Sequence, residues 1–225
     1  MIWRIIIFTG LILMLMTTSA LAEGGSYNFV NQKDIYTYND YTVQHVRGLM
    51  LNIEVKDIRP EVERKGGLLE EQAVDGYFSR PMDSMVREIL IREMQKTGMM
   101  TLAQANSETM DYRITLEILS LYGGVQEKAD DEDGAVRRWF IPKVAKGSAS
   151  IRVIIRDRYG RDYMNVVYNT SAEQEQARMS NYAKGSIRTL GVALKEVFYQ
   201  LQSDIDAKQL PKNPSASGSQ KLLKR

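Results

Sequence analysis

The sequence predicts an α+β fold, a two-layer sandwich in which two long helices cover one face of a mixed or antiparallel sheet. Several segments alternate apolar and polar residues, as strands with one buried face do. Two longer segments carry apolar residues at three- and four-residue steps, as helices with one buried stripe do. The segments follow one another as strand, helix, four strands and helix. Packing both helices on one sheet face would bury every apolar stripe at once.

The composition fits one folded domain with tails. The chain has 225 residues, of which 44% are hydrophobic and 26% are charged, which is ordinary for a folded domain. It contains no cysteine and a single histidine, His45, which we expect at the surface. These counts exclude disulfides, thiolate metal sites, a cysteine nucleophile and a site with several histidine ligands. Motifs for a serine nucleophile, a phosphate loop or a dinucleotide are absent, so we expect no enzyme activity, cofactor or metal.

Residues 1–22 have the pattern of a cleavable secretory signal peptide. Arg4 is the only charge, an apolar stretch covers residues 5–16, and Ala20 and Ala22 form an A-x-A cleavage site. In a bacterium this signal directs the chain to the periplasm. The alternative is an uncleaved signal that anchors the chain in the inner membrane, because the segment approaches the ~18 residues that a membrane span needs.

A tyrosine-rich arm, residues 23–48, precedes the single α+β domain predicted over residues 49–206. The arm is polar and has no clear period, so we expect an ordered arm or a short edge strand. The first strand is expected over Leu49–Val55, and Asp57–Pro60 ends it because proline cannot donate to a sheet ladder. The following residues, Glu61–Ser79, are rich in charge and glycine and predict a long exposed loop.

The first long helix is expected over Pro81–Thr97. Ser79 can cap its start, Pro81 suits its first turn, and Gly98 is a natural stop. A methionine-rich stripe could be a promiscuous binding face, but the helical spacing is typical of core. The stripe consists of Met82, Met85, Val86, Ile89, Leu90 and Met94.

Four strands follow this helix. A short strand is expected over Met99–Leu102 and a longer one over Tyr112–Ile118, followed by a loop over Gly123–Ala135. The acidic run of that loop lacks the end carboxylates of a calcium-binding loop. The last two strands form a hairpin over residues 149–169, with Gly160 in its turn. We expect the polar face of the sheet to be hydrated or covered by a partner; it carries Arg113, Thr115, Glu117, Arg152 and Arg156.

A second long helix is expected over Asn181–Asp206, with a buried stripe that begins at Ile187. Residues 207–225 then form a flexible tail with five basic and no acidic residues. The folded body is therefore weakly acidic although the formal net charge of the chain is +2. A weakly acidic body argues against a nucleic-acid partner. For the basic tail we expect at most a weak contact with anionic lipid head groups.

Four short motifs carry a resemblance to a known family: Val55–Pro60 (VKDIRP), Met94–Gly98 (MQKTG), Met110–Glu117 (MDYRITLE) and the turn Asp157–Gly160 (DRYG). In this order, between a signal peptide and a closing helix, they resemble YajG-like bacterial envelope lipoproteins. More loosely, they resemble the auxiliary lipoproteins of ABC-type transport systems. The resemblance implies a non-enzymatic periplasmic domain that binds partner proteins or lipid-related machinery. Those lipoproteins are anchored through a cysteine after the signal, where this chain has Glu23, so the anchor is not implied here.

These observations predict a non-catalytic periplasmic accessory or assembly protein of a bacterial envelope system, which acts by binding other proteins of an envelope complex. The alternative is a module that binds a lipid or a small apolar ligand between the helices and the sheet. The residues that we expect to bind a partner are Asp57, Arg59, Arg137, Arg138, Trp139 and Phe140.

Overall fold

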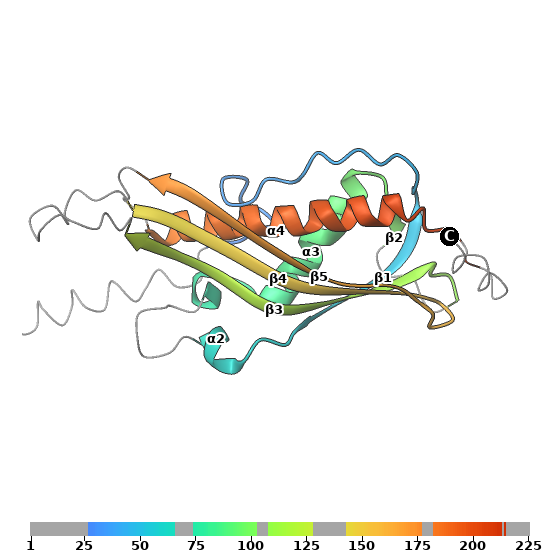
Figure 1. The fold of residues 1–225 in the computed structure, drawn as a ribbon, viewed down its shortest axis with the longest axis horizontal. Helices are drawn as coiled ribbons and strands as arrows, with labels where there is room; N and C mark the ends of the chain where they lie inside the picture. Colours follow the sequence, from blue (N-terminus) through green and yellow to red (C-terminus); the bar gives the residue numbers. More distant parts are fainter. Residues whose placement is uncertain are drawn as a thin grey trace, which may run out of the picture.

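The computed structural model describes residues 27–65, 74–102, 108–127, 143–176, 182–212 and 214 (Figure 1). The strands are β1 (Leu49–Asp57), β2 (Met100–Leu102), β3 (Tyr112–Glu127), β4 (Lys143–Asp157) and β5 (Asp162–Gln176). The helices are α2 (Glu61–Lys65), the 3-10 turn η1 (Val74–Tyr77), α3 (Met82–Lys96) and α4 (Tyr182–Ala207). The predicted α+β class is therefore correct. Across the described residues, no helix is both long enough and apolar enough to span a membrane.

The strands form one mixed sheet in the order β2-β1-β3-β4-β5. β1 runs parallel to β2 and β3, whereas β3, β4 and β5 are antiparallel to one another. The register places Ile53 beside Ile114, Ile114 beside Ile155, and Ile155 beside Met164, and all four side chains are buried. Because side chains alternate along a strand, one face of the sheet is continuous core. The long strands curl along their length over α4 (Figure 1).

Both long helices cover the apolar face of the sheet, as predicted. α3 packs against β1 and β2, while α4 packs against β3, β4 and β5. The methionine-rich stripe of α3 is buried along its whole length, so it is core and not a binding face. The buried stripe of α4 consists of Ile187, Leu190, Leu194, Val197, Phe198, Leu201 and Ile205.

The three strands that contact α4 are longer than predicted. Gly123–Glu127 was expected in a loop, but these residues pair with Lys143–Gly147 and extend β3 and β4. Pairing along the sheet outweighs the weak strand preference of this glycine-containing segment. The exposed loop expected over Glu61–Ser79 is also wrong in part, because α2 and η1 lie within it and Phe78 is buried.

The first long helix begins one residue later than predicted, and Ser79 does not cap it. The N-cap position is held by Pro81, without a capping hydrogen bond from a side chain. Ser79 instead donates its hydroxyl to the carbonyl of Tyr27 in the arm, at 3.3 Å. The predicted stop and turn are confirmed, since Gly98 and Gly160 have φ of +75° and +80°, values that favour glycine.

The described part of the arm, Tyr27–Gly48, is ordered and covers the helices. It forms a third layer, beside the sheet and the helix layer that the sequence predicted. It has little regular structure, and its bridge between Tyr27 and Phe78 is isolated. Phe29, Ile35 and Tyr36 are nonetheless buried in the same cluster as the helices and the sheet. The chain is thus layered as sheet, helices and arm.

Two buried carboxylates hold the arm, one on each long helix. Glu93 of α3 accepts hydrogen bonds from the Tyr36 hydroxyl at 2.8 Å and from the Asn39 backbone N–H at 2.9 Å. Asp206 of α4 accepts from the backbone N–H groups of Gln44, His45 and Val46 at 2.7, 2.8 and 2.8 Å. The side chain of His45 lies at the surface, as predicted.

Candidate functional site

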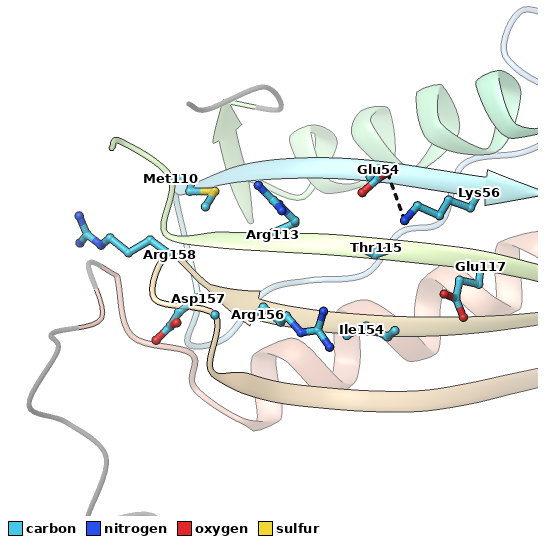
Figure 2. Close-up of a pocket in the computed structure, with 11 residues that line it drawn as sticks. Glu54, Lys56, Met110, Arg113, Thr115, Glu117, Ile154, Arg156, Asp157 and Arg158 are labelled. Atoms are coloured by element: carbon cyan, nitrogen blue, oxygen red, sulfur yellow. Dashed lines mark ion pairs between the residues drawn. The ribbon is translucent and has the colours of Figure 1, made fainter. Parts of the chain in front are cut away.

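The outer face of the sheet, which points away from the helices, gathers the polar side chains of three strands. Figure 2 shows Glu54 and Lys56 of β1 on the same side as Arg113, Thr115 and Glu117 of β3, together with Ile154 and Arg156 of β4. Strand alternation places them there, because the residues between them belong to the core. The prediction that Arg113, Thr115, Glu117, Arg152 and Arg156 share one polar face is confirmed.

A pocket of about 320 Å³ lies on this outer face, near the β4–β5 turn. Seven of its lining residues carry a charged group, so the pocket suits a polar or charged ligand group. The lining residues are Glu54, Lys56, Met110, Arg113, Thr115, Glu117, Ile154, Arg156, Asp157, Arg158 and Gly160.

Two arginines stand directly opposite each other in this pocket. Arg113 of β3 and Arg156 of β4 are cross-strand partners in the sheet. Like charges in this position destabilise a sheet unless an anion lies near them. Arg156 has such an anion, because its Nε donates to Asp162 Oδ1 at 2.5 Å. Arg113 is exposed and makes no ion pair or side-chain hydrogen bond with any residue that the structure describes.

Most other charges of the pocket are neutralised by neighbours. Lys56 lies 3.4 Å from Glu54, and Arg152 lies 3.5 Å from Glu117. Asp157 is buried at the start of the hairpin turn, where Arg161 donates to it at 2.6 Å. Its carboxylate also accepts from the backbone N–H groups of Tyr159 and Arg161, at 2.9 and 3.0 Å. These carboxylates therefore already have partners within the protein.

Arg158 lies at the turn end of the pocket (Figure 2). Its Nη1 donates to the backbone carbonyl of Glu108 at 3.3 Å, and its guanidinium lies 5.6 Å from the centre of the Tyr159 ring. The Nε atom is buried and has no hydrogen-bond partner among the described residues. Arg158 and Arg113 are thus two cations of the pocket without a carboxylate partner in the described part of the chain. Guanidinium groups bind carboxylates and phosphates through paired N–H donors, which makes this an anion-binding arrangement.

The predicted partner-binding residues Asp57 and Arg59 form a separate cluster at the end of β1, in which Arg59 is buried and Asp57 is partly exposed. Arg59 donates to Asp57 at 2.5 Å and to Asp75 of η1 at 2.9 Å, and its side chain has no exposed surface. Burial alone would raise the pKa of Asp57, but the hydrogen bond and positive charge of Arg59 outweigh it and lower that pKa. The cluster ties η1 to β1. A role in partner binding stays a prediction for both residues.

The other predicted partner-binding residues, Arg137, Arg138, Trp139 and Phe140, lie outside the described residues. Sequence reasoning missed Glu54, Lys56 and Arg158 as members of the pocket. The polar positions of β1 were recognisable from its alternation, but their place beside Arg113 depends on the parallel pairing of β1 with β3. In the described part of the chain, no three acidic or histidine side chains are grouped to hold a metal ion.

No family model matches the sequence, and no curated protein matches it. Among solved structures, a Xanthomonas campestris protein of the DUF330 family is similar with 13% identity and a TM-score of 0.48. That similarity covers 77% of this chain and 91% of the other. A minor lipoprotein of Acinetobacter baumannii is 13% identical over 72% of this chain and 96% of the other, with a TM-score of 0.40. An uncharacterized lipoprotein B of Nitrosomonas europaea is 14% identical over 75% and 92%, with a TM-score of 0.37. The YajG-like relationship stays a prediction.

Proposed function

We propose that this chain is a non-catalytic accessory protein of the bacterial envelope, which binds an acidic segment of a partner protein on the outer face of its sheet. The observation that carries the proposal is the arginine pair in the pocket. Arg113 and Arg156 face each other across two strands, and Arg113 has no anionic partner among the described residues. A carboxylate from a partner would relieve the repulsion between the two guanidinium groups and accept hydrogen bonds from them.

The envelope location rests on the N-terminal sequence. Residues 1–22 carry the pattern of a signal peptide, which would deliver the folded body to the periplasm. An uncleaved signal would place the same body at the periplasmic side of the inner membrane. In either case the outer face of the sheet would meet other envelope proteins.

A binding role is favoured over catalysis by what lines the pocket. The lining contains no histidine and no cysteine, and most of its charged groups already form ion pairs with neighbours. Binding an anion needs only the positive groups that are left over. Catalysis would also need a nucleophile or an acid–base pair poised toward a substrate.

A polar partner is also favoured over the alternative of a lipid or small apolar ligand. The pocket lies on the face away from the helices, and its lining is mostly charged. Between the helices and the sheet, where an apolar ligand was expected, side chains such as Leu116, Val153 and Leu194 are fully buried in one hydrophobic cluster. The pocket therefore suits the carboxylates of a partner better than an acyl chain.

The proposal can be tested with a fluorescent peptide rich in aspartate and glutamate, titrated with the full chain at low salt. We expect binding that weakens as salt is added, and at least tenfold weaker binding by the Arg113→Glu variant, because a like charge then faces the peptide. Lys33→Glu is the matched control, since it makes the same charge reversal at an exposed position in the arm, on the other side of the helices. It should bind the peptide as the wild type does.

Two further probes distinguish a protein partner from other anions. Inorganic phosphate should compete only weakly, and vesicles containing anionic lipid should not bind in a way that depends on Arg113. Equal peptide binding by the Arg113→Glu and Lys33→Glu variants would contradict the proposed site. Tight vesicle binding that is lost in Arg113→Glu would replace the protein partner by a lipid head group.

A further inference from the structure

The strand β5 forms a long open edge of the sheet. It comprises 15 residues and stands last in the strand order. Among the described residues, its hydrogen-bonded backbone partners all belong to β4. The opposite edge is β2, which has only three residues. An edge strand exposes a row of unpaired N–H and C=O groups, and a short edge offers far fewer of them.

The middle of β5 lacks the features that normally protect an edge strand. The ten residues Tyr163–Ala172 include no charged residue, no proline and no glycine, and the irregularity in the pairing with β4 lies only at their start, at Tyr163. Proteins usually place lysine, proline, a bulge or a cover on such an edge to prevent pairing with another chain. Val167, at the centre of this segment, is 44% exposed. The segment therefore has the character of a strand that pairs with another strand.

The sequence of β5 is complementary to itself in one antiparallel register. When Val167 faces Val167 of a second copy, Asn165 faces Asn169, and the acidic residue Asp162 faces Ala172. A shift by one residue in one direction would instead set Asp162 against Glu173, and opposed like charges destabilise a sheet.

The two asparagines can also link the copies. Their Oδ1 atoms accept hydrogen bonds from Arg152 and Ser150 of β4, at 2.9 and 2.7 Å, and their amide N–H groups have no partner among the described residues. These groups lie on the outer face, where the facing asparagine of a second copy would accept them.

We propose that two copies of this chain pair through antiparallel β5 strands in the register centred on Val167. Pairing would join two five-stranded sheets into one, bury both exposed valines, and satisfy the backbone groups of both edges. The contact is two-fold symmetric, the commonest symmetry of protein dimers. The helices of both copies would lie on the same side of the joined sheet and leave both outer faces open.

Cysteine cross-linking tests the register directly, because the chain has no cysteine of its own. In the proposed dimer two Val167→Cys residues face each other at about 4.5–5.5 Å between Cα atoms, which a disulfide can bridge. Mild oxidation should convert this variant to a linked dimer. The control, Val192→Cys, has a similarly exposed position on α4, with 51% exposure, and should remain largely unlinked.

A mixing experiment makes the register test sharper. Asn165→Cys and Asn169→Cys should each fail to link to themselves, because the two copies of either cysteine would lie roughly 14 Å apart along the strands. A mixture of the two variants should form linked heterodimers. Self-linking by either single variant, or equal linking of Val167→Cys and Val192→Cys, would overturn the proposed register.

Sedimentation velocity of the full chain tests the association without cross-linking. The wild type should form dimers as its concentration rises. Val167→Lys should raise the dissociation constant of the dimer at least tenfold, because two lysines would face each other at the centre of the contact. Val192→Lys should leave it unchanged. A wild type that stays monomeric up to its solubility limit would overturn the proposal.

Discussion

Arg59 is a single side chain on which the end of β1 and the segment after it both depend. Its buried guanidinium binds Asp57 and Asp75, whose side chains are 13% and 27% exposed. Arg59→Ala would leave two carboxylates close together without their cation. We expect it to lower the free energy of unfolding by about 3 kcal/mol, the lower end for a broken buried ion pair, because both carboxylates keep some contact with water.

Urea unfolding of Arg59→Ala and of Arg80→Ala measures this difference. Arg80 also pairs with a carboxylate, that of Glu88, but its side chain is 40% exposed. The loss at Arg80 should therefore stay below about 1 kcal/mol. Similar losses of unfolding free energy in the two variants would show that burial does not strengthen the contribution of the Arg59 ion pairs to stability.

Asp206 gives a second effect at the residue scale, one that depends on pH. Burial alone would raise the pKa of Asp206, but the backbone N–H groups of Gln44, Val46 and His45 outweigh it and lower that pKa below its ordinary value of 3.8. A lowered pKa in the folded state stabilises the fold above the unfolded value of 3.8. This stabilisation is lost as the pH falls through the folded-state pKa.

Asp206→Asn should therefore lower the free energy of unfolding by about 2 kcal/mol at neutral pH, since it removes an acceptor that carries full charge. The difference from the wild type should shrink from pH 5 to pH 3, where the wild-type carboxylate takes up a proton. The pKa of Glu93 is raised, chiefly by burial, but it affects both proteins alike and cancels in the comparison. Urea unfolding at several pH values measures the difference, and a constant one would contradict the role of the Asp206 charge.

Single residues show where sequence reasoning succeeds and where it fails. The polar positions of β3 and of β4 were recognisable from alternation alone, so Arg113 and Arg156 were assigned to the correct face. Asp57 and Arg59, which belong to the motif Val55–Pro60, were expected to bind a partner. Arg59 is instead buried and pairs with Asp75, which is 16 residues further along the chain, and no local sequence pattern predicts such a contact.

At the scale of elements, β4 and α4 approach each other closely at Gly147. A Cβ atom added there would lie well inside 3.0 Å of the backbone of Thr189 and Leu190, so the helix itself would have to move. We expect Gly147→Ala to lower the free energy of unfolding by about 2 kcal/mol or more, as overpacking of a rigid contact does.

Gly76→Ala is the matched control, because no atom lies within 4 Å of its added Cβ and its φ is not positive. It should change the free energy of unfolding by less than about 0.5 kcal/mol. Thermal or urea unfolding of both variants provides the measurement. Equal stability of the two would mean that α4 does not lie against β4 at this point.

Helices and strands were predictable where a long periodic pattern supports them. They were less predictable where the pairing between strands determines how far an element extends. The buried stripes of α3 and α4 place both helices within a residue or two of their predicted ends. The ends of β3 and β4 were missed because Gly123 and Gly147 weaken the local strand pattern, while their pairing with each other restores it. The parallel pairing of β1 with β3, which assembles the pocket, joins strands that are far apart in sequence.

At the scale of the whole molecule, the position of the arm determines which surfaces are exposed. It covers the helices on the side away from the sheet, and its apolar side chains share their core. The outer face of the sheet and the edge of β5 are left without a cover in the described part of the chain. These are the two surfaces to which we assign partners, an acidic segment on the face and a second copy at the edge.

The arm should consequently behave as part of the folded core and not as a loose loop. The amides of Asn39, Gln44, His45 and Val46 donate to buried carboxylates, so exchange with solvent requires these contacts to open.

Hydrogen exchange measured by mass spectrometry should show peptides of the arm protected like those of α4. The same peptides in the chain unfolded with urea should exchange at once. Asp206→Asn should speed exchange at residues 44–46 at least tenfold while α3 stays protected. Arm peptides that exchange as fast in the folded chain as in the unfolded one would show that the carboxylates do not hold the arm against the helices.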